Sequence, residues 1–220
     1  MWPVRRFIAV LLVSLLALVA ASMGGAALAD RGDPKERFNR ADQARAKSML
    51  LRASDLAGFT ARPGGSRDID FYCRALDESD LTVTGKAESP QFTAGVAFVT
   101  SQAYVYARVA DSNASWRRGT SAAGQRCLRE GLRRELSGTN VKLVSFGKLS
   151  FPRLGPRSVA FRVVAAQQGV RIYLDLLAVQ NGRAQVAVVL GSGLTPPPRA
   201  TEVRLGRLVA ARMAKAMRGA

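Results

Sequence analysis

Four β-rich runs in the second half of the chain constrain its fold more than any other feature of the sequence. Apolar and β-branched residues dominate positions 141–151, 159–166, 170–179 and 184–190. Short turn sequences separate these runs, among them Gln168-Gly169 and Asn181-Gly182. Asn-Gly between two apolar runs is the strongest short-range hairpin signal. We therefore expect three of these runs to form an antiparallel meander.

Apolar residues at helical spacing predict a first helix before the strands. Ala46, Met49, Leu50 and Ala53 follow an i, i+3, i+4, i+7 pattern. We expect Asp42 to be its N-cap and Gly58 to follow its end. Residues 71–73 then predict a short strand, and the polar residues up to Pro90 predict loops with short extended pieces.

The middle of the chain predicts a strand followed by a helix. Residues 96–109 contain two alternating apolar registers, which either one strand bent near Ser101 or two strands would explain. Asp111 or Ser112 is placed to cap the next helix. One side of that helix carries Trp116, Thr120, Ala123, Cys127 and Leu128, and Leu132 and Leu136 extend it.

A last helix follows Thr195 and three prolines at 196–198. Its expected inner stripe consists of Leu205, Leu208, Val209, Arg212 and Ala216, and its other side carries Arg204, Arg207, Lys215 and Arg218. The expected order of elements is a helix, strands, a second helix, the meander and a last helix. This order predicts an α+β fold, a single domain with a mainly antiparallel sheet covered by helices.

The first 29 residues predict a secretory signal peptide. Arg5-Arg6 precede an apolar run over 7–21, and Ala27-Leu28-Ala29 matches a cleavage site. An uncleaved membrane anchor is the alternative, because residues 7–29 approach the length of a spanning helix. Residues 30–40 are charged and predict a flexible leader, so the expected boundaries are 1–29, 30–40 and 41–220. The expected location is secreted, or on the extracellular face of the cell envelope.

The chain is strongly basic, with 33 Lys and Arg against 16 Asp and Glu and a net charge of +17. Loss of residues 1–29 would remove only Arg5 and Arg6, lowering the net charge by two to +15. Such a balance favours anionic partners, such as phospholipid headgroups, wall polymers, nucleic acid or acidic proteins. Solvated surface charge without a partner is the alternative.

Cys73 and Cys127 are the only cysteines in the chain. Because an exported chain reaches an oxidising compartment, we expect them to form a disulfide. On the chain-entropy account, closing a loop of this length stabilises the fold by about 4 kcal/mol. Two buried free thiols are the alternative. A zinc site is not expected, because two cysteines without histidine cannot supply the usual four ligands.

The chain has no histidine, which excludes Ser-His-Asp and Cys-His catalytic sites. Ser145-Phe146-Gly147-Lys148 matches an S-x-x-K pattern, but it lies in an expected strand, whereas that motif functions at a helix start. We therefore expect no catalytic residues, no cofactor and no enzymatic activity.

Acidic residues cluster at two places, Asp68/Asp70 and Asp77/Glu78/Asp80, both in expected loops. Carboxylate pairs can catalyse glycoside hydrolysis, but acids in loops of a basic protein more simply serve as solvated charges. The second cluster could hold a weak Ca²⁺, although it lacks the D-x-D-x-D-G spacing. We expect no metal site.

Two basic helix faces are candidate binding surfaces. Arg126, Arg129 and Arg133 share one side of the Cys127 helix, and Arg204, Arg207, Lys215 and Arg218 share one side of the last helix. Either face could contact anionic lipids or phosphorylated wall polymers through salt-sensitive contacts. A solvated helix face, partly neutralised by pairs such as Glu130 with Arg134, is the alternative. Nucleic acid is not an expected partner, because aromatic residues do not alternate with the basic ones.

Three segments of the chain resemble a known family. The segments are LLRASDLAGF at 50–59, LTVTGKA at 81–87 and SQAYVY at 101–106. They are similar to secreted actinobacterial sensor-domain-containing proteins, which resemble the extracellular sensor domain of mycobacterial serine/threonine kinases. The resemblance implies a single α+β domain of the PsbP-like type, exported to the cell envelope, that binds something rather than catalyses.

These observations lead to two expectations about function. The first is a secreted, non-enzymatic sensor-like or ligand-binding domain of the cell envelope, with a ligand or envelope protein held in a cleft between the sheet and the helices. The alternative is a basic envelope-associated protein that docks on anionic lipids or wall polymers through its last helix.

Overall fold

The C-terminal strands form a four-stranded antiparallel meander in the computed structural model, which describes residues 32–63 and 73–218. Its strands are β6 (Val141–Lys148), β7 (Arg157–Gln167), β8 (Val170–Asn181) and β9 (Ala184–Gly193). The β7–β8 turn places Gln168 at φ 50° and Gly169 at φ 82°. The predicted meander is confirmed and includes one strand more than expected. The expected signal peptide, the acids at 68 and 70, and residues 71–72 lie outside the described residues.

The sheet continues beyond β9 in the order β1-β3-β5-β9-β8-β7-β6. The additional strands are β1 (Lys35–Glu36), β3 (Thr82–Glu88) and β5 (Ala97–Tyr106), while β2 (Thr60–Arg62) and β4 (Gln91–Ala94) extend one side of β5. β5 is a single strand with continuous register against β9, which decides between the two alternatives for residues 96–109. β3 lies in the polar stretch that was expected to form loops with short extended pieces. In the structure only Val83 and Gly85 of this strand are buried.

Residues 35–39 differ from the expected flexible leader. Lys35 and Glu36 pair in parallel with Thr82 and Val83. The backbone N–H of Lys35 donates to the Leu81 carbonyl at 2.9 Å, and that of Asn39 donates to the Thr84 carbonyl at 3.0 Å. Because the partner strand lies far along the chain, no local pattern indicated this pairing.

The first helix, α2, extends from Arg40 to Met49 and is capped by Asn39 rather than by Asp42. The Asn39 side chain accepts a hydrogen bond from the Asp42 N–H at 2.9 Å. Asp42 itself lies in the first turn and is buried. The short 3₁₀ helix η1 (Ala53–Asp55) follows α2.

The helix expected after β5 is two helices, α3 (Val109–Thr120) and α4 (Ala122–Leu136). They separate at Ser121, whose extended backbone ends α3 and whose side chain accepts a hydrogen bond from the Gly124 N–H at 2.9 Å. A Cβ at Gly124 would collide with the Arg118 carbonyl, so only glycine allows this close junction. The N-cap of α3 is Arg108, not Asp111 or Ser112.

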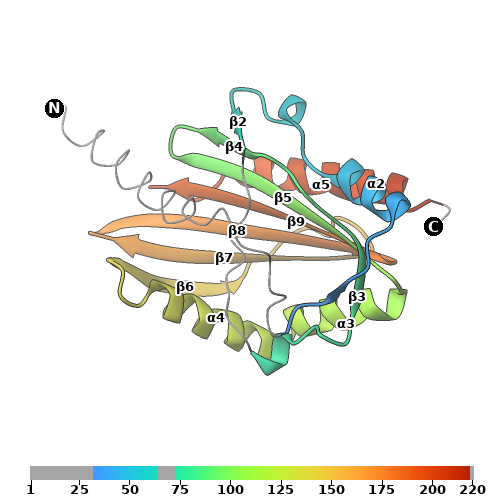
Figure 1. Cartoon of the computed structure of the whole chain (residues 1–220). Helices are drawn as coiled ribbons and strands as arrows, with labels where there is room; N and C mark the ends of the chain where they lie inside the picture. The colour runs from blue at the N-terminus through green and yellow to red at the C-terminus, as the bar shows by residue number, and fades with distance from the viewer. Residues whose placement is uncertain (1–31, 64–72, 219–220) are drawn as a thin grey trace.

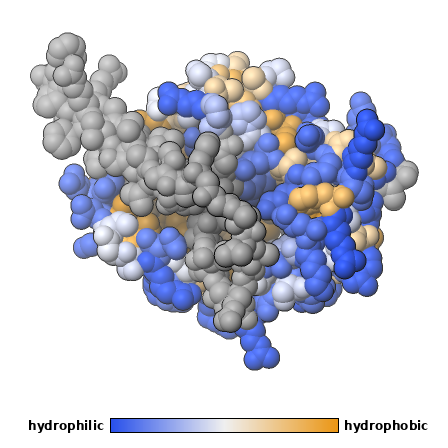
Figure 2. Space-filling view, in the orientation of Figure 1, coloured by the Kyte–Doolittle hydropathy of each residue, from blue (hydrophilic) through white to orange (hydrophobic). Residues whose placement is uncertain are grey.

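Two layers of helices enclose the sheet, giving a single α+β domain (Figure 1). α2 packs beside the last helix, α5 (Arg199–Ala216), on one face of the sheet. The main core lies beneath this layer and includes Met49, Leu177, Val188 and Leu205. α3 and α4 pack together on the other side, with α4 beside β6. In the view of Figure 2, hydrophilic side chains cover most of the described surface, and apolar side chains form separate patches.

The expected disulfide is present between Cys73 and Cys127. Cys73 immediately precedes the short helix η2 (Arg74–Leu76), and Cys127 is a buried residue of α4. The bond therefore connects the segment before β3 to the second of the two helices that follow β5.

A substitution at Gly85 tests how closely α2 approaches the sheet. A Cβ at this residue of β3 would collide with the Asp42 backbone carbonyl, whereas a Cβ at Gly147 of β6 would meet nothing within 4 Å. We expect Gly85→Ala to lower the free energy of unfolding by about 2–3 kcal/mol through overpacking. Gly147→Ala should leave it unchanged or raise it by about 0.5 kcal/mol. Urea unfolding monitored by circular dichroism measures both, and equal effects would contradict the close approach.

Candidate functional site

The basic residues predicted on the last helix are all exposed, with three on the solvent side of α5 and Arg218 just after the end of that helix. The helix buries Leu205, Val209 and Met213, each at most 1% exposed, against the sheet. The exposed side carries Arg204 and Arg207, and Lys215 lies further along the same side. With a rise of about 1.5 Å per residue, Arg204 and Lys215 lie about 16 Å apart along the axis. Arg212, expected in the inner stripe, instead forms an ion pair with Asp55.

The acidic residues of α2, η1 and α5 are Asp42, Asp55 and Glu202. None of them projects freely into solvent. Each is buried or held in an ion pair.

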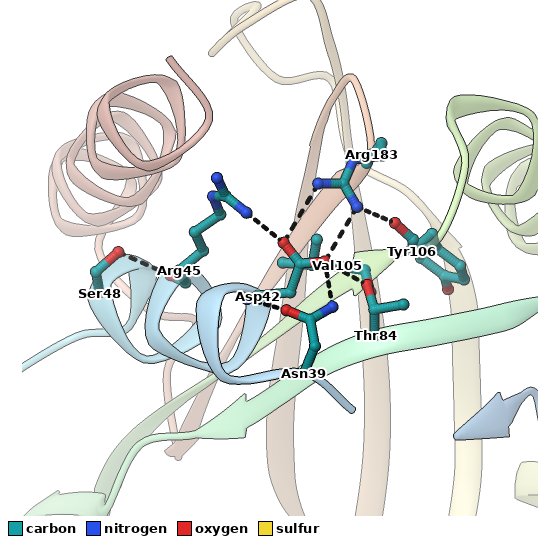
Figure 3. A network of polar contacts seen from close by, with 8 residues as sticks. All are labelled: Asn39, Asp42, Arg45, Ser48, Thr84, Val105, Tyr106 and Arg183. Carbon is teal, nitrogen blue, oxygen red and sulfur yellow. Dashed lines mark hydrogen bonds and ion pairs between the residues drawn. The ribbon is translucent and has the colours of Figure 1, made fainter. Parts of the chain in front are cut away.

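Asp42 is the centre of a polar network that attaches α2 to the sheet (Figure 3). Its carboxylate, from a residue only 3% exposed, accepts hydrogen bonds from Thr84 of β3 at 2.6 Å and from Arg45 at 2.6 Å. Both terminal nitrogens of Arg183, in the β8–β9 turn, donate to it at 3.1 and 3.2 Å. Burial by itself would raise the pKa of Asp42, but the hydrogen bonds, led by that from Arg183, hold the pKa well below its usual range.

Asp55 attaches η1 to α5. The Arg212 guanidinium donates to its two carboxylate oxygens at 2.6 and 2.8 Å, and also to the Leu50 carbonyl at 2.7 Å. Arg204 donates to the backbone carbonyl of Asp55 at 2.9 Å, which positions its guanidinium without neutralising it. Burial of the Asp55 carboxyl is outweighed by the hydrogen bonds that it accepts, so its pKa is lowered.

Glu202 of α5 and Asp175 of β8 are both 0% exposed. Arg162 of β7 donates to both oxygens of Asp175, at 2.6 and 2.5 Å, and to Glu202 at 3.3 Å. Arg199 donates to the other Glu202 oxygen at 3.2 Å. Burial, together with the hydrogen bond shared with Asp175, raises the pKa of Glu202 to about 7. A catalytic carboxylate pair needs space for a substrate between its members, whereas these two side chains are fully buried and interact with each other.

Seven basic residues on or beside the same elements are exposed. We call the following exposed set the basic layer: Arg40, Lys47, Arg52, Arg204, Arg207, Lys215 and Arg218. Within the described residues, none of the seven forms an ion pair, because the three carboxylates are engaged by Arg45, Arg162, Arg183, Arg199 and Arg212. The outer surface of the α2–α5 layer is therefore positive and lacks exposed carboxylates on its own elements.

A hollow of about 610 Å³ lies on the outer side of the first turns of α5. Its described lining residues are Arg199, Ala200, Val203, Arg204 and Arg207. The Arg199 guanidinium stacks on the Phe151 ring, 3.9 Å from its centroid. Three arginines thus line this hollow, and two of them, Arg204 and Arg207, belong to the basic layer.

The basic residues predicted on α4 are also exposed, but they lie elsewhere. Arg133 pairs with Glu130 at 2.8 Å, where Arg134 was the expected partner, and Arg129 donates to the Phe146 carbonyl at 3.2 Å. Arg126 is exposed on the same helix. α4 lies beside β6, on the opposite side of the molecule from α2 and α5 (Figure 1). The two predicted basic faces do not form one surface.

The acidic cluster near Cys73 does not converge on one point. Asp80 accepts two hydrogen bonds from Arg118 at 2.7 and 2.8 Å, Asp77 accepts one from the Ser79 N–H at 3.0 Å, and Glu78 accepts one from the Tyr106 hydroxyl. Burial raises the pKa of Glu78. Over residues 32–63 and 73–218, no three Asp, Glu, Cys or His side chains are grouped so that they could hold a metal ion.

The S-x-x-K match at 145–148 lies in β6, as expected. Residues three apart in a strand point to opposite faces, so Ser145 and Lys148 are not placed to act together.

Sequence reasoning missed the buried ion pairs, although two of them had a local signal. Arg162 and Asp175 are equidistant from the Gln168-Gly169 turn, and counting outward from a two-residue turn pairs them across β7 and β8. Arg199 and Glu202 stand three residues apart on α5. The pair of Asp42 with Arg183 joins residues 141 positions apart, and no sequence pattern marks it.

Comparisons with known proteins find similarity only among solved structures. No protein-family model and no curated protein sequence matches the chain. Among solved structures, the extracellular domain of PknH from Mycobacterium tuberculosis is similar, with a TM-score of 0.46 and 9% sequence identity over 79% of this chain and 96% of that domain. At this level of similarity, function has to be argued from the residues of the chain itself.

Removing the Asp42 carboxylate tests its role in attaching α2. Asp42→Asn would remove the buried carboxylate and leave the partly buried Arg183 guanidinium without its ion pair, and we expect the free energy of unfolding to fall by about 3 kcal/mol. Asp80→Asn breaks an exposed pair with Arg118 and should cost less than about 1 kcal/mol. Urea unfolding of both variants measures the difference, and similar losses would contradict a special role for Asp42.

Glu202 should make stability depend on pH. Its folded pKa of about 7 lies above its ordinary 4.5, so the native state binds the proton more tightly. The stability that this contributes is complete below the unfolded pKa and is lost as the pH rises through the folded pKa, a loss of about 3 kcal/mol at most. Glu78, whose pKa is also raised, acts in the same direction.

Glu202→Gln should therefore flatten the dependence of stability on pH. A glutamine side chain can keep the hydrogen bonds of the protonated carboxyl but cannot ionise. In urea titrations between about pH 5 and about pH 8, the variant should lose less stability than the wild type by on the order of 2 kcal/mol. The Glu78→Gln variant measures how much of the pH dependence of stability comes from Glu78. Parallel pH curves for wild type and Glu202→Gln would exclude the proposed protonation of Glu202.

Proposed function

We propose that this chain is a non-enzymatic binding domain of the bacterial cell envelope that docks on an anionic lipid surface through the basic layer. The observation that supports the proposal is the segregation of charge within the α2–α5 layer. Its carboxylates are buried against the sheet or paired, whereas seven of its basic side chains are exposed without an ion pair among the described residues. Among those residues, no helix is long and apolar enough to cross a membrane.

The arrangement of the basic layer suits a planar partner. Its cations are distributed over two neighbouring helices, α2 and α5, and the residues just after each of them, rather than along one line. The exposed residues between these cations include Ala44, Ala211 and Ala214. Their methyl side chains are too short to prevent a bilayer from reaching the cations. A bilayer can therefore approach the cations of both helices together.

The expected strength of this contact is sufficient for docking and sensitive to salt. A Lys or Arg close to an anionic membrane contributes about 1 kcal/mol, so seven such residues supply up to about 7 kcal/mol. The attraction falls off within about 10 Å at 0.1 M salt. Export, as predicted from residues 1–29, would deliver the domain to such a surface.

A ligand cleft beneath α2 and α5 is less well supported than surface docking. The residues that face each other there, such as Met49, Leu177, Val188 and Leu205, are at most 1% exposed. They fill the interface between the sheet and these helices with apolar side chains. The hollow that lies on α5 opens on its outer side instead.

Vesicle cosedimentation tests the docking surface with two charge-matched variants. One variant carries Arg204→Gln, Arg207→Gln, Lys215→Gln and Arg218→Gln on α5, and the other carries Arg126→Gln, Arg129→Gln, Arg133→Gln and Arg134→Gln on α4. On phosphatidylglycerol-containing vesicles at low salt, the α5 variant should bind roughly 100-fold more weakly than the wild type. The α4 variant should stay within about threefold of it, because its residues lie on the opposite side.

The controls separate the proposal from its alternatives. Neutral phosphatidylcholine vesicles and high salt should both abolish binding by the wild type. Equal losses in the two variants would mean that net charge alone drives binding and would refute a defined docking surface. Binding to isolated cell walls but not to vesicles would replace the lipid surface with a wall polymer.

A further inference from the structure

The hollow on α5 differs from the rest of the basic layer because two of its three guanidinium groups are held in place. Arg199 stacks on Phe151, donates to the Ser150 carbonyl and donates to Glu202 at 3.2 Å. Arg204 donates to the Asp55 carbonyl at 2.9 Å. A pre-positioned guanidinium loses less conformational entropy when it binds a ligand than a free side chain does.

Arg199 and Arg204 already use some of their N–H donors in the hydrogen bonds described above, whereas Arg207 does not. It makes no hydrogen bond to any residue in the described part of the chain, so all five of its N–H groups are available. The N-cap of α5, Pro198, makes no side-chain hydrogen bond to the helix, so no side chain of that residue caps the first amides, which lie at Arg199 and Ala200. These groups all favour a negative charge in the hollow.

The charge of the described lining residues indicates the kind of anion that fits. Arg199, Arg204 and Arg207 contribute three positive charges, and Glu202, which contacts Arg199, is the one carboxyl that offsets them. A doubly charged anion balances this set better than a singly charged one. Guanidinium groups bind phosphate oxygens with two parallel hydrogen bonds each, a geometry that Lys cannot provide.

We propose that the hollow binds the phosphate monoester headgroup of a membrane lipid, with Arg199, Arg204 and Arg207 as its ligands. This inference rests on the proposed function, since it makes the hollow the selective part of the docking surface. The volume of about 610 Å³ is in the range of small-molecule sites and exceeds the space needed for a phosphate group alone. A headgroup presented on a bilayer meets the hollow because the hollow opens in the basic layer itself.

The test compares phosphatidic acid vesicles with phosphatidylglycerol vesicles adjusted to the same surface charge. Both carry phosphate, but only phosphatidic acid presents a monoester. The wild-type protein should bind the phosphatidic acid vesicles about tenfold more tightly, because the monoester dianion matches the three guanidinium groups. Equal binding to the two vesicles would overturn the selective site and leave surface docking intact.

Two single variants on the same helix face locate the selectivity. Arg207→Gln should lose the preference for phosphatidic acid, whereas Lys215→Gln, with the same loss of charge outside the hollow, should retain it. Arg207→Lys keeps the charge but lacks the planar fork, so it should also lose most of the preference. Loss of the preference in Lys215→Gln, or its retention in Arg207→Gln, would contradict the assignment.

Glycerol phosphate, a soluble phosphate monoester, distinguishes the two sources of the ligand. Calorimetric titration of the wild-type protein should show binding that Arg207→Gln weakens at least about tenfold, and binding should be weaker than to phosphatidic acid vesicles because the rest of the basic layer is not engaged. If glycerol phosphate binds through Arg207 but neither vesicle binds, surface docking fails. The hollow would then be a site for a soluble phosphate, and the lipid assignment would be refuted.

Discussion

The burial of carboxylates beneath the α2–α5 layer is the interaction on which the rest of the structure depends. Asp42 attaches α2 to β3 and to the β8–β9 turn, and Glu202 attaches α5 to β7 and β8 through Arg162. Removing charges from water is costly. Several hydrogen bonds offset this cost for Asp42, whereas burial still raises the pKa of Glu202. The same contacts explain both how the helices are held on the sheet and why their outer surface is positive.

This division of charge gives the two sides of the helical layer different properties. The inner side combines an apolar core with ion pairs of defined geometry, which set the position of each helix. The outer side keeps basic residues whose potential acidic partners are engaged below. A variant that disturbs the inner contacts is expected to affect stability, whereas a variant of the basic layer is expected to affect binding. The two kinds of effect can therefore be measured separately.

The parts of the fold that could be predicted depend on contacts between residues close in the chain. The β6–β9 meander follows from adjacent hairpins, and the inner and outer sides of α5 follow from its periodicity. β3 was missed because its partners are β1 and β5 and because its own sequence is mostly polar. The break at Ser121 was missed because only the close approach of Gly124 to Arg118 reveals why the helix stops.

The sequence by itself determined the α+β class, the order of the C-terminal strands, the pairing of Cys73 with Cys127 and the exposed basic side of α5, because periodicity, turn residues and composition are local properties. Only the tertiary structure decided which charges stay at the surface. Asp42 pairs with Arg183, 141 positions along the chain, and Glu202 pairs with Arg162, 40 positions away. Neither ion pair can therefore be inferred from the sequence before the fold is known. The electrostatic character of the α2–α5 layer is thus a product of packing, since burial selects which ions find partners and which face solvent.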